Sequence, residues 1–408
     1  MTATAPRVLM IGTALSGKGG IAAVVSVLDQ DGLFEREGVR YLATHAEGSR
    51  SRKARVALAG FWRTALACLA ERPAVVHAHS ASHASFFRKS LLLLIARRCG
   101  ARTVFHLHGG GFRDFATSES GPLARWWIRH TLEASSVVIA LSDGWAQFLA
   151  GFAPKASVRV VPNSVDVSRL ASSCEEEAGR ILFLGRADTP KGVYDLLAAV
   201  AALAPRFPHV RLAVGGDGDL ALLRTRAAQL GIAARLEVLG WIGAQDKADQ
   251  LARASVFCLP SHAEGLPMAM LEAMSFSVVP IASDGEGAMQ WLVTSGQEGY
   301  ICHLSHWPTQ AMECLAYLRN HPAMLRNMKD AARKRFLDEY QSSMTAGKLL
   351  RLIQQPTVDR SRPMTRFKVL RWHRPLRPDG LKSPLLDRFC YRAGLLRNAG
   401  ILDTTRSL

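Results

Sequence analysis

The first 165 residues alternate short runs of β-branched and aliphatic residues with segments that repeat apolar residues at helical spacing. The first run, Arg7–Gly12, reads RVLMIG and is typical of a buried strand, and Ile21–Asp29 follows it with a helical pattern. Strands that alternate with helices predict parallel βαβ units. The other elements predicted in this half are strands at Ala74–His79, Thr103–His108, Ser136–Ser142 and Val158–Pro162, and helices at Arg55–Glu71 and Arg88–Arg98.

The alternation stops at residues 166–179, which are polar and without periodicity, and it restarts at Arg180. This pattern is typical of a linker between two α/β domains. Residues 331–355 have the pattern of a final helix. The elements predicted in between are strands at Arg180–Gly185, Val210–Gly215, Leu236–Gly240, Val256–Pro260 and Val278–Ser283, and helices at Tyr194–Leu203, Leu220–Leu230, Asp246–Ala254 and Met268–Met274.

The sequence therefore predicts an α/β fold of two doubly wound domains, residues 1–165 and 180–355, which face each other across a cleft. Ligands of such domains bind at the carboxyl ends of the strands. Residues 356–408 are rich in Arg and Pro, and we expect a basic tail there rather than a third domain.

Composition narrows the class of protein. Apolar residues make up 48% of the 408 residues and charged residues 21%, which excludes a disordered chain. Apolar stretches such as Leu91–Ala96 are far too short to cross a bilayer. The N-terminus leads straight into the first predicted strand, and the seven cysteines contain no CxxC pair. We therefore expect a cytoplasmic protein with reduced thiols.

The net charge of +17 is unevenly distributed. Residues 1–165 carry 20 basic and 10 acidic side chains, residues 166–355 carry 19 and 20, and residues 356–408 carry 12 and 4. We therefore expect the first half and the tail to meet something anionic. The candidates are a membrane surface, a phosphate-bearing lipid and a nucleic acid.

Three glycine-rich turns follow predicted strands, where backbone N–H groups can face an anion. The first, at residues 12–20, nearly matches a Walker A loop, but Gly19 stands where a magnesium-binding hydroxyl is needed. Nucleotide hydrolysis is therefore not expected, and a tight turn without a ligand explains the segment equally well.

The second turn, Gly216–Ala221, has the GxGxxA spacing of a dinucleotide fingerprint, and Glu237 follows at about the expected distance. This turn stands in the second βα unit of its domain, whereas a dinucleotide fingerprint is expected in the first unit. A dinucleotide-dependent oxidoreductase is therefore a minor alternative. The third turn, at residues 185–192, places Arg186 and Lys191 beside the first strand of the second domain. Two cations at this place suit the binding of a diphosphate. The competing interpretation is that both are simply exposed charges of a surface loop.

Residues 260–274 read PSHAEGLPMAMLEAM and predict a strand end, a loop and a helix start. Pro267 suits the first helical position, where free N–H groups and the helix dipole favour a phosphate or a sugar hydroxyl. Glu264 lies in the loop and Glu272 in the second turn of the helix, so both carboxylates are expected at one mouth. Carboxylates accept hydrogen bonds from the hydroxyls of sugars and ribose. A capping or surface role explains either glutamate alone.

This E-x7-E motif with an internal GLP, after a strand that ends in Pro-Ser, resembles the retaining glycosyltransferases of family 4, which have the GT-B fold. Further segments resemble the family in the same order, over about residues 7–350, and suggest the bacterial surface-polysaccharide type. They are GKGG at 17–20, FHLHG at 105–109, PNSVD at 162–166 for the usual PNGVD, the diphosphate loop at 185–192, GDG at 216–218 and LGWI at 239–242.

The resemblance implies two catalytic residues: Glu264, which would bind donor-sugar hydroxyls near the reaction centre, and His108, which would lie close to the sugar across the cleft. His106 competes for that place, but we expect its side chain on the other face of the strand. Glu272 would hold the ribose of the nucleotide. The other donor-binding residues implied are Arg186 and Lys191 at the diphosphate, Gly265, Leu266, Pro267 and Met268 beside it, Gly19 and Gly20 from the first domain, and Trp241 and Ile242 at the base.

The resemblance also implies the partners. The donor would be a UDP- or GDP-sugar, and no metal or other cofactor is expected, because cations can neutralise the leaving diphosphate. The sequence departs from the family after Glu272, where Ser275-Phe276-Ser277 replaces an Ala-x-Gly step and the usual Gly-Gly pair is spread over Gly285 and Gly287. The donor sugar is therefore not predicted.

Basic residues at 50–63 accompany an apolar stripe formed by Leu58, Phe61, Trp62 and Ala65, as in helices that lie at a membrane interface. A core-packed helix with a solvated basic end is the competing interpretation. Together with the charge distribution, this pattern predicts peripheral binding to the anionic inner face of the cytoplasmic membrane. The acceptor would be lipid-diphosphate-linked or a carbohydrate.

A nucleic-acid-binding or scaffold role of the basic tail is the alternative from another class. Aromatic residues that could stack on bases are sparse in the tail, so a nucleic acid is not expected as a partner.

Overall fold

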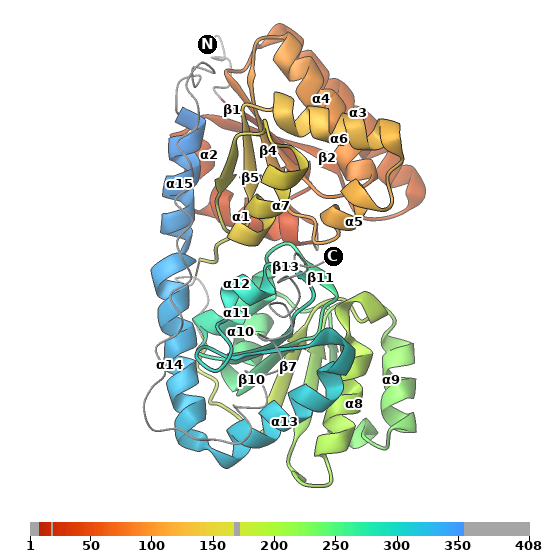
Figure 1. The fold of residues 1–408 in the computed structure, drawn as a ribbon, viewed down its shortest axis with the longest axis vertical. Helices are drawn as coiled ribbons and strands as arrows, with labels where there is room; N and C mark the ends of the chain where they lie inside the picture. The colour runs from red at the N-terminus through yellow and green to blue at the C-terminus, as the bar shows by residue number, and fades with distance from the viewer. Residues whose placement is uncertain (1–7, 18, 167–171, 355–408) are drawn as a thin grey trace, which may run out of the picture. The chain divides into compact units, whose positions relative to one another are not determined.

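A computed structural model describes residues 8–17, 19–166 and 172–354, and the predicted tail at 356–408 lies outside them. The N-terminal half is built on one sheet of six parallel strands in the order β2-β1-β3-β4-β5-β6 (Figure 1). Its strands are β1 (Val8–Thr13), β2 (Val39–His45), β3 (Val75–Ser80), β4 (Arg102–Leu107), β5 (Val137–Ala140) and β6 (Val158–Val160).

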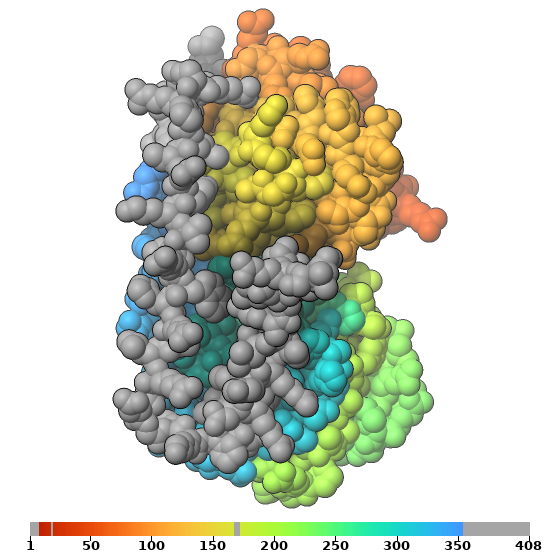
Figure 2. All heavy atoms as spheres, viewed as in Figure 1, coloured from red at the N-terminus to blue at the C-terminus, as the bar shows by residue number. Residues whose placement is uncertain are grey.

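The central strands of this sheet are buried on both faces, because helices cover both. Every side chain of β3 and β5 is buried. The helices are α1 (Gly20–Gln30), α2 (Leu33–Arg36), α3 (Arg50–Ala70), α4 (Ala84–Arg98), α5 (Phe112–Thr117), α6 (Pro122–Ala134) and α7 (Asp143–Phe152). Helices α3, α4 and α6 lie together on one side of the half, and their side chains form its outer surface in orange (Figure 2).

The C-terminal half repeats this architecture with six parallel strands in the order β14-β12-β10-β7-β8-β9. Its strands are β7 (Arg180–Leu184), β8 (Arg211–Gly215), β9 (Leu236–Gly240), β10 (Val256–Leu259), β12 (Val279–Ser283) and β14 (Tyr300–Cys302). Its helices are α8 (Val193–Leu203), α9 (Leu220–Gln229), α10 (Ala244–Arg253), α11 (Met268–Ser275), α12 (Met289–Leu292) and α13 (Trp307–Asn320), with short 3-10 turns at Thr189–Lys191, Ala233–Arg235 and Leu304–His306.

The chain then returns to the first half. Residues 331–355 do not form one final helix: α14 (Pro322–Glu339) packs on α11, and α15 (Ser342–Gln354) begins after a break. Helix α15 places Leu349, Leu352 and Ile353 in the hydrophobic core of the N-terminal sheet, with Val8, Leu28 and Val104 among their neighbours. The Ile353 carbonyl of α15 also accepts a hydrogen bond of 3.2 Å from the Arg102 guanidinium. Burial of these apolar residues explains why the last part of the predicted second domain belongs to the first core.

No helix in the described ranges is long and apolar enough to span a bilayer.

Replacing Leu349 with Ala tests the return of α15. Leu349 is 1% exposed, so Leu349→Ala should lower the free energy of unfolding by about 2–5 kcal/mol through lost burial and a cavity. Urea denaturation followed by circular dichroism measures the change. Met344→Ala, at a 44% exposed position of the same helix, is the control and should change stability little. Equal stability of both variants would show that α15 is not part of the core.

Candidate active site

The loop that carries Glu264 is held by a two-stranded parallel sheet. Strand β11 (Ala263–Glu264) pairs with β13 (Glu286–Gly287). A Cβ on Gly287, whose φ is +119°, would lie 1.7 Å from the Glu264 carbonyl oxygen, and one on Gly285 would lie 2.4 Å from that of Ser261. The two glycines that replace the family's adjacent pair therefore both permit close backbone packing against this loop.

Glu264 and Lys191, which come from two separate motifs of the sequence, form an ion pair in the structure. The Lys191 ammonium donates to Glu264 Oε1 at 2.5 Å, and both side chains are largely buried. Lys191 ends a 3-10 turn whose first residues are capped by Asp188, which accepts from the Lys191 N–H at 3.1 Å. Gly192 follows with φ +68°, and a Cβ there would lie 2.1 Å from the Pro260 carbonyl oxygen, so only glycine allows this approach.

Glu272 lies on α11, 7% exposed, with its carboxylate 2.5 Å from the Lys247 ammonium of α10. Sequence reasoning missed Lys247, because nothing distinguishes it from other surface cations of an amphipathic helix. Met268 begins α11, as in the predicted helix Met268–Met274, whereas Pro267 is the N-cap and not the first helical residue. After the helix, Ser277 adopts φ +59° where the family has glycine.

Arg186 does not join the Lys191–Glu264 pair. Its side chain is 66% exposed, and its Nε lies 3.2 Å from Asp188 Oδ2. The turn that carries it packs instead on residues 216–218, since a Cβ on Gly216 would lie 1.9 Å from the Gly185 carbonyl oxygen. The glycines of the apparent dinucleotide fingerprint thus have a packing role in this loop.

The remaining donor-site predictions lie around the same strand ends. Trp241 is 52% exposed, and Ile242 packs beside Gly215 at the end of β8. Gly19 precedes the first turn of α1, which begins at Gly20, and a Cβ on either glycine would meet open space. Helix α1 contacts α11, the helix of Glu272. The carboxyl ends of both sheets are therefore brought together at this point.

The loop after β4 presses its backbone against the Glu264 loop. A Cβ on Gly265 would lie 2.2 Å from the His108 carbonyl oxygen, and one on Gly110 would lie 2.7 Å from the Glu264 Cα. The main chain of the loop after β4 therefore lies directly against that of the Glu264 loop. Two further side chains of the N-terminal half fix the loop: Trp145 Nε1 donates to the Gly265 carbonyl at 3.1 Å, and buried Asn163 donates to that of Leu266 at 2.9 Å.

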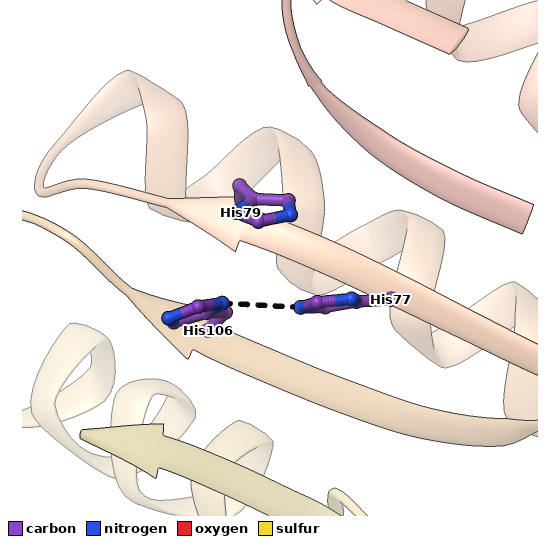
Figure 3. Close-up of side chains that lie close together, drawn as sticks. All are labelled: His77, His79 and His106. Carbon is purple, nitrogen blue, oxygen red and sulfur yellow. Dashed lines mark hydrogen bonds between the residues drawn. The ribbon is translucent and has the colours of Figure 1, made fainter. Parts of the chain in front are cut away.

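The expectation for His106 is wrong. Residues two apart on a strand share a face, and the rings of His106 and His108 lie with centroids 4.1 Å apart. His77 and His79 of β3 complete an array of two hydrogen-bonded pairs. His77 Nε2 lies 3.2 Å from His106 Nδ1 (Figure 3), and His79 Nδ1 lies 2.8 Å from His108 Nε2.

Three of these histidines, His77, His79 and His106, offer nitrogens within 4.8 Å of one another, which is close enough for a metal ion. The His77 and His79 rings stack, with centroids 4.4 Å apart and planes inclined by 29°. His77 and His106 are already bonded to each other (Figure 3). The array therefore fits hydrogen-bonded imidazole pairs better than metal ligation.

All four imidazoles are neutral at physiological pH. Burial lowers the pKa of His77 to about 3. The pKa of His108 is also lowered to about 3, first by burial and then by the nearby His77 and Lys89. The pKa values of His79 and His106 are also well below 6.5, mainly through burial. His108 can thus exchange hydrogen bonds with a bound molecule without carrying a charge.

An apolar pocket of about 180 Å³ lies elsewhere, lined by Gly179, Phe207 and Leu318 among others. It sits at the amino ends of the C-terminal strands, and no predicted site residue lines it. Because ligands of doubly wound sheets bind at the carboxyl ends, we place the site at Glu264.

Comparison with known proteins identifies the family of the chain. The family model described as glycosyl transferases group 1 matches residues 169–335, and that described as Glycosyltransferase Family 4 matches residues 7–169. The chain belongs to glycosyltransferase family 4. The predicted membership is confirmed.

Curated relatives include two mannosyltransferases. The phosphatidyl-myo-inositol mannosyltransferase of Mycobacterium tuberculosis is 32% identical over 205 residues, 48% of this chain and 53% of that protein. The GDP-mannose:cellobiosyl-diphosphopolyprenol alpha-mannosyltransferase of Xanthomonas campestris is 29% identical over 231 residues, 55% and 59% of the two chains. The chain thus spans about half the length of the curated relatives it matches.

Solved structures confirm the GT-B fold. The sucrose-phosphate synthase of Thermosynechococcus elongatus superposes with a TM-score of 0.69 at 15% identity, over 85% of this chain and 97% of that one. Anabaena HepE in complex with UDP and glucose superposes with a TM-score of 0.66 at 15% identity, over 86% and 100%.

The buried histidines predict a loss of stability in acid. The folded pKa of His77, about 3, lies below the unfolded value near 6.5, so the unfolded state takes up the proton first as pH falls. This histidine should therefore cost about 3 kcal/mol of stability between pH 6.5 and pH 4. His77→Gln should remove that loss, as chemical denaturation at the two pH values would measure.

His209→Gln, at an exposed position, is the matched control and should leave the acid dependence unchanged. An identical pH dependence in His77→Gln and the wild type would contradict a buried neutral His77.

Proposed function

We propose that the protein transfers a hexose, with retention, from a UDP- or GDP-sugar to a lipid-linked acceptor in polysaccharide or glycolipid assembly. The observation that carries this proposal is the Lys191–Glu264 ion pair, which lies where the backbone of the His108 loop meets the Glu264 loop. The two mannosyltransferase relatives, whose names specify a phosphatidylinositol and a diphosphopolyprenol, support the acceptor class.

The chemistry of the site suits a sugar joined to a diphosphate. Lys191 offers an ammonium that a diphosphate can share with Glu264, and the exposed Arg186 guanidinium, which pairs with Asp188, stands in the same turn. These cations would offset the charge of the leaving group without a metal. Glu264 would accept hydrogen bonds from sugar hydroxyls, and Glu272, oriented by Lys247, would accept those of the ribose.

His108 would face the sugar from the N-terminal half as a neutral donor. His79 Nε2 is buried without a partner, and a bare lone pair there costs less than an unpaired N–H, so we place the His79 proton on Nδ1. It then donates to His108 Nε2, which leaves the His108 proton on Nδ1. Such a fixed tautomer presents an N–H to a sugar hydroxyl.

The role of the Lys191–Glu264 pair is tested by transfer assays after thermal stabilisation has selected the donor from UDP, GDP, ADP and their sugars. Glu264→Gln and Lys191→Met should each lower kcat at least about 100-fold, because each removes a charge placed for the transition state. Glu175→Gln, at an exposed position of the same half, should retain full activity.

In the same assay the product should keep the anomeric configuration of the donor by NMR, and EDTA should leave the rate unchanged. Unaltered transfer by Glu264→Gln would refute the site, and inversion or loss of activity in EDTA would refute the corresponding part of the mechanism.

We further propose that the N-terminal half docks on the anionic inner face of the cytoplasmic membrane. The stripe expected on α3 is partly wrong, since Ala65 is buried and Phe61 half-buried. The exposed stripe is Leu58, Trp62, Leu66 and Leu69, each about 60% exposed and spaced along one helical face. Neighbouring helices add further exposed apolar side chains: Phe87 and Leu91 of α4, and Leu123 and Trp126 of α6.

Exposed basic residues surround this apolar face and would meet anionic headgroups: Arg50, Arg52, Lys53, Arg55 and Arg63 of α3, and Arg125 and Arg129 of α6. A large exposed apolar surface of this kind marks an interaction site, and the charge selects an anionic bilayer as the partner.

The double variant Leu58→Ser, Trp62→Ser should reduce recovery with anionic vesicles about tenfold or more in a flotation assay, through loss of two inserted side chains. Leu222→Ser, at a 38% exposed position of α9 in the neutral half, is the matched control and should float like the wild type. Equal recovery with neutral and anionic vesicles, or none with either, would contradict membrane docking.

A further inference from the structure

Helix α4 buries a lysine that no carboxylate neutralises. Lys89 is 1% exposed, and its ammonium donates to Ser85 Oγ at 2.7 Å. Among the described residues it forms no ion pair. Burial, with Arg88 nearby, lowers the pKa of Lys89 to about 7. A buried cation without a counter-ion lowers stability, so such a residue points to a function.

More cations than anions surround Lys89. Burial lowers the pKa of His45, at the end of β2, and the nearby charges of Arg88, Lys89 and Lys53 lower it further, while Glu47 acts in the opposite direction. The Nε of Arg88 is buried without a hydrogen-bond partner. Lys89 also lies close enough to His79 and His108 to act on their charge, so this cluster adjoins the candidate active site.

The Ser85 hydroxyl is the group through which the buried Lys89 ammonium can act on a ligand. Its half-buried hydroxyl oxygen accepts from Lys89 and from the Ala81 N–H, the latter at 3.2 Å. Two donors occupy the lone pairs of the oxygen, so its own O–H is left to donate to an incoming group. His83, which precedes the helix, adopts φ +53°, a strained conformation for a residue other than glycine that is often found at functional sites.

We propose that Ser85, backed by Lys89 and Arg88, binds the diphosphate of the lipid-linked acceptor. The inference rests on the proposed function and names a second anion site in it. The donor diphosphate already has Lys191 and Arg186 in the C-terminal half, whereas this cluster belongs to α4, which packs between α3 and α6 of the apolar face. A lipid whose chain meets that face can place its diphosphate at the start of α4.

The site can be tested with farnesyl diphosphate, a short lipid diphosphate, and with farnesol as its uncharged counterpart, by calorimetry on the full chain. Lys89→Met should weaken binding of farnesyl diphosphate about tenfold or more, because it removes a charge-assisted hydrogen bond behind the ligand. Ser85→Ala should weaken it too. Lys191→Met, a lysine of the donor site, is the matched control and should bind like the wild type.

Thermal stability separates a binding role from a structural one. Lys89→Met should melt at a higher temperature than the wild type at pH 6, since an apolar side chain replaces a buried cation. Stabilisation by the nucleotide-sugar donor should be unchanged, which shows that the donor site is intact and tests the proposed function separately.

Equal binding of farnesyl diphosphate by Lys89→Met and the wild type would overturn the proposal, as would loss of that binding in Lys191→Met instead. A lower melting temperature together with unchanged binding would show that Lys89 is structural. Binding of inorganic pyrophosphate that also depends on Lys89 would support a site for the headgroup, whereas farnesol binding that depends on Lys89 would refute it.

Discussion

The arrangement of the site depends on a close backbone contact between the loop after β4 and the loop that carries Glu264. No side chain fits between them, since a Cβ on Gly110 or Gly265 would overlap the opposing main chain. Gly287 imposes the same constraint from the other side of the Glu264 loop. With its main chain clamped between two neighbours, Glu264 has a fixed position, and Lys191 can reach it at 2.5 Å. A carboxylate held in this way does not need to be ordered again when a ligand binds.

Much of this arrangement could be predicted from the sequence, because buried strands leave a strong signal. Runs such as RVLMIG and VFHLHG lie in the centre of a sheet, where both faces are apolar. Strand β2 was not predicted, since it is an edge strand whose residues are mostly half-exposed and therefore mixed in polarity. Helix α15 was assigned to the wrong core, because periodicity shows that a helix has an apolar face but not which sheet receives it.

The candidate site, too, could be predicted from the sequence only in part. Glycine-rich turns and the two glutamates have fixed positions relative to strand ends, so Glu264 and Lys191 could both be placed near the carboxyl ends of the strands. Lys247 could not, because its contact with Glu272 depends on how α10 packs against α11. The histidine array was available in principle: two HxH segments end adjacent parallel strands, and period-two alternation places each pair on one face. The error over His106 came from applying that rule incorrectly.

The two halves of the molecule differ in whether the cations near the site are paired with carboxylates, and this difference bears on function. In the C-terminal half the cations near the site are matched: Lys191 with Glu264, Lys247 with Glu272, and Arg186 with Asp188. Matched charges can exchange partners when a donor arrives, at little cost in stability. In the N-terminal half Lys89 is buried and, among the described residues, has no ion-pair partner. An anion bound beside such a cation would stabilise it, so the proposed acceptor site would couple ligand binding to the stability of the N-terminal half. The charge imbalance of the sequence is therefore present both at the surface and inside the fold.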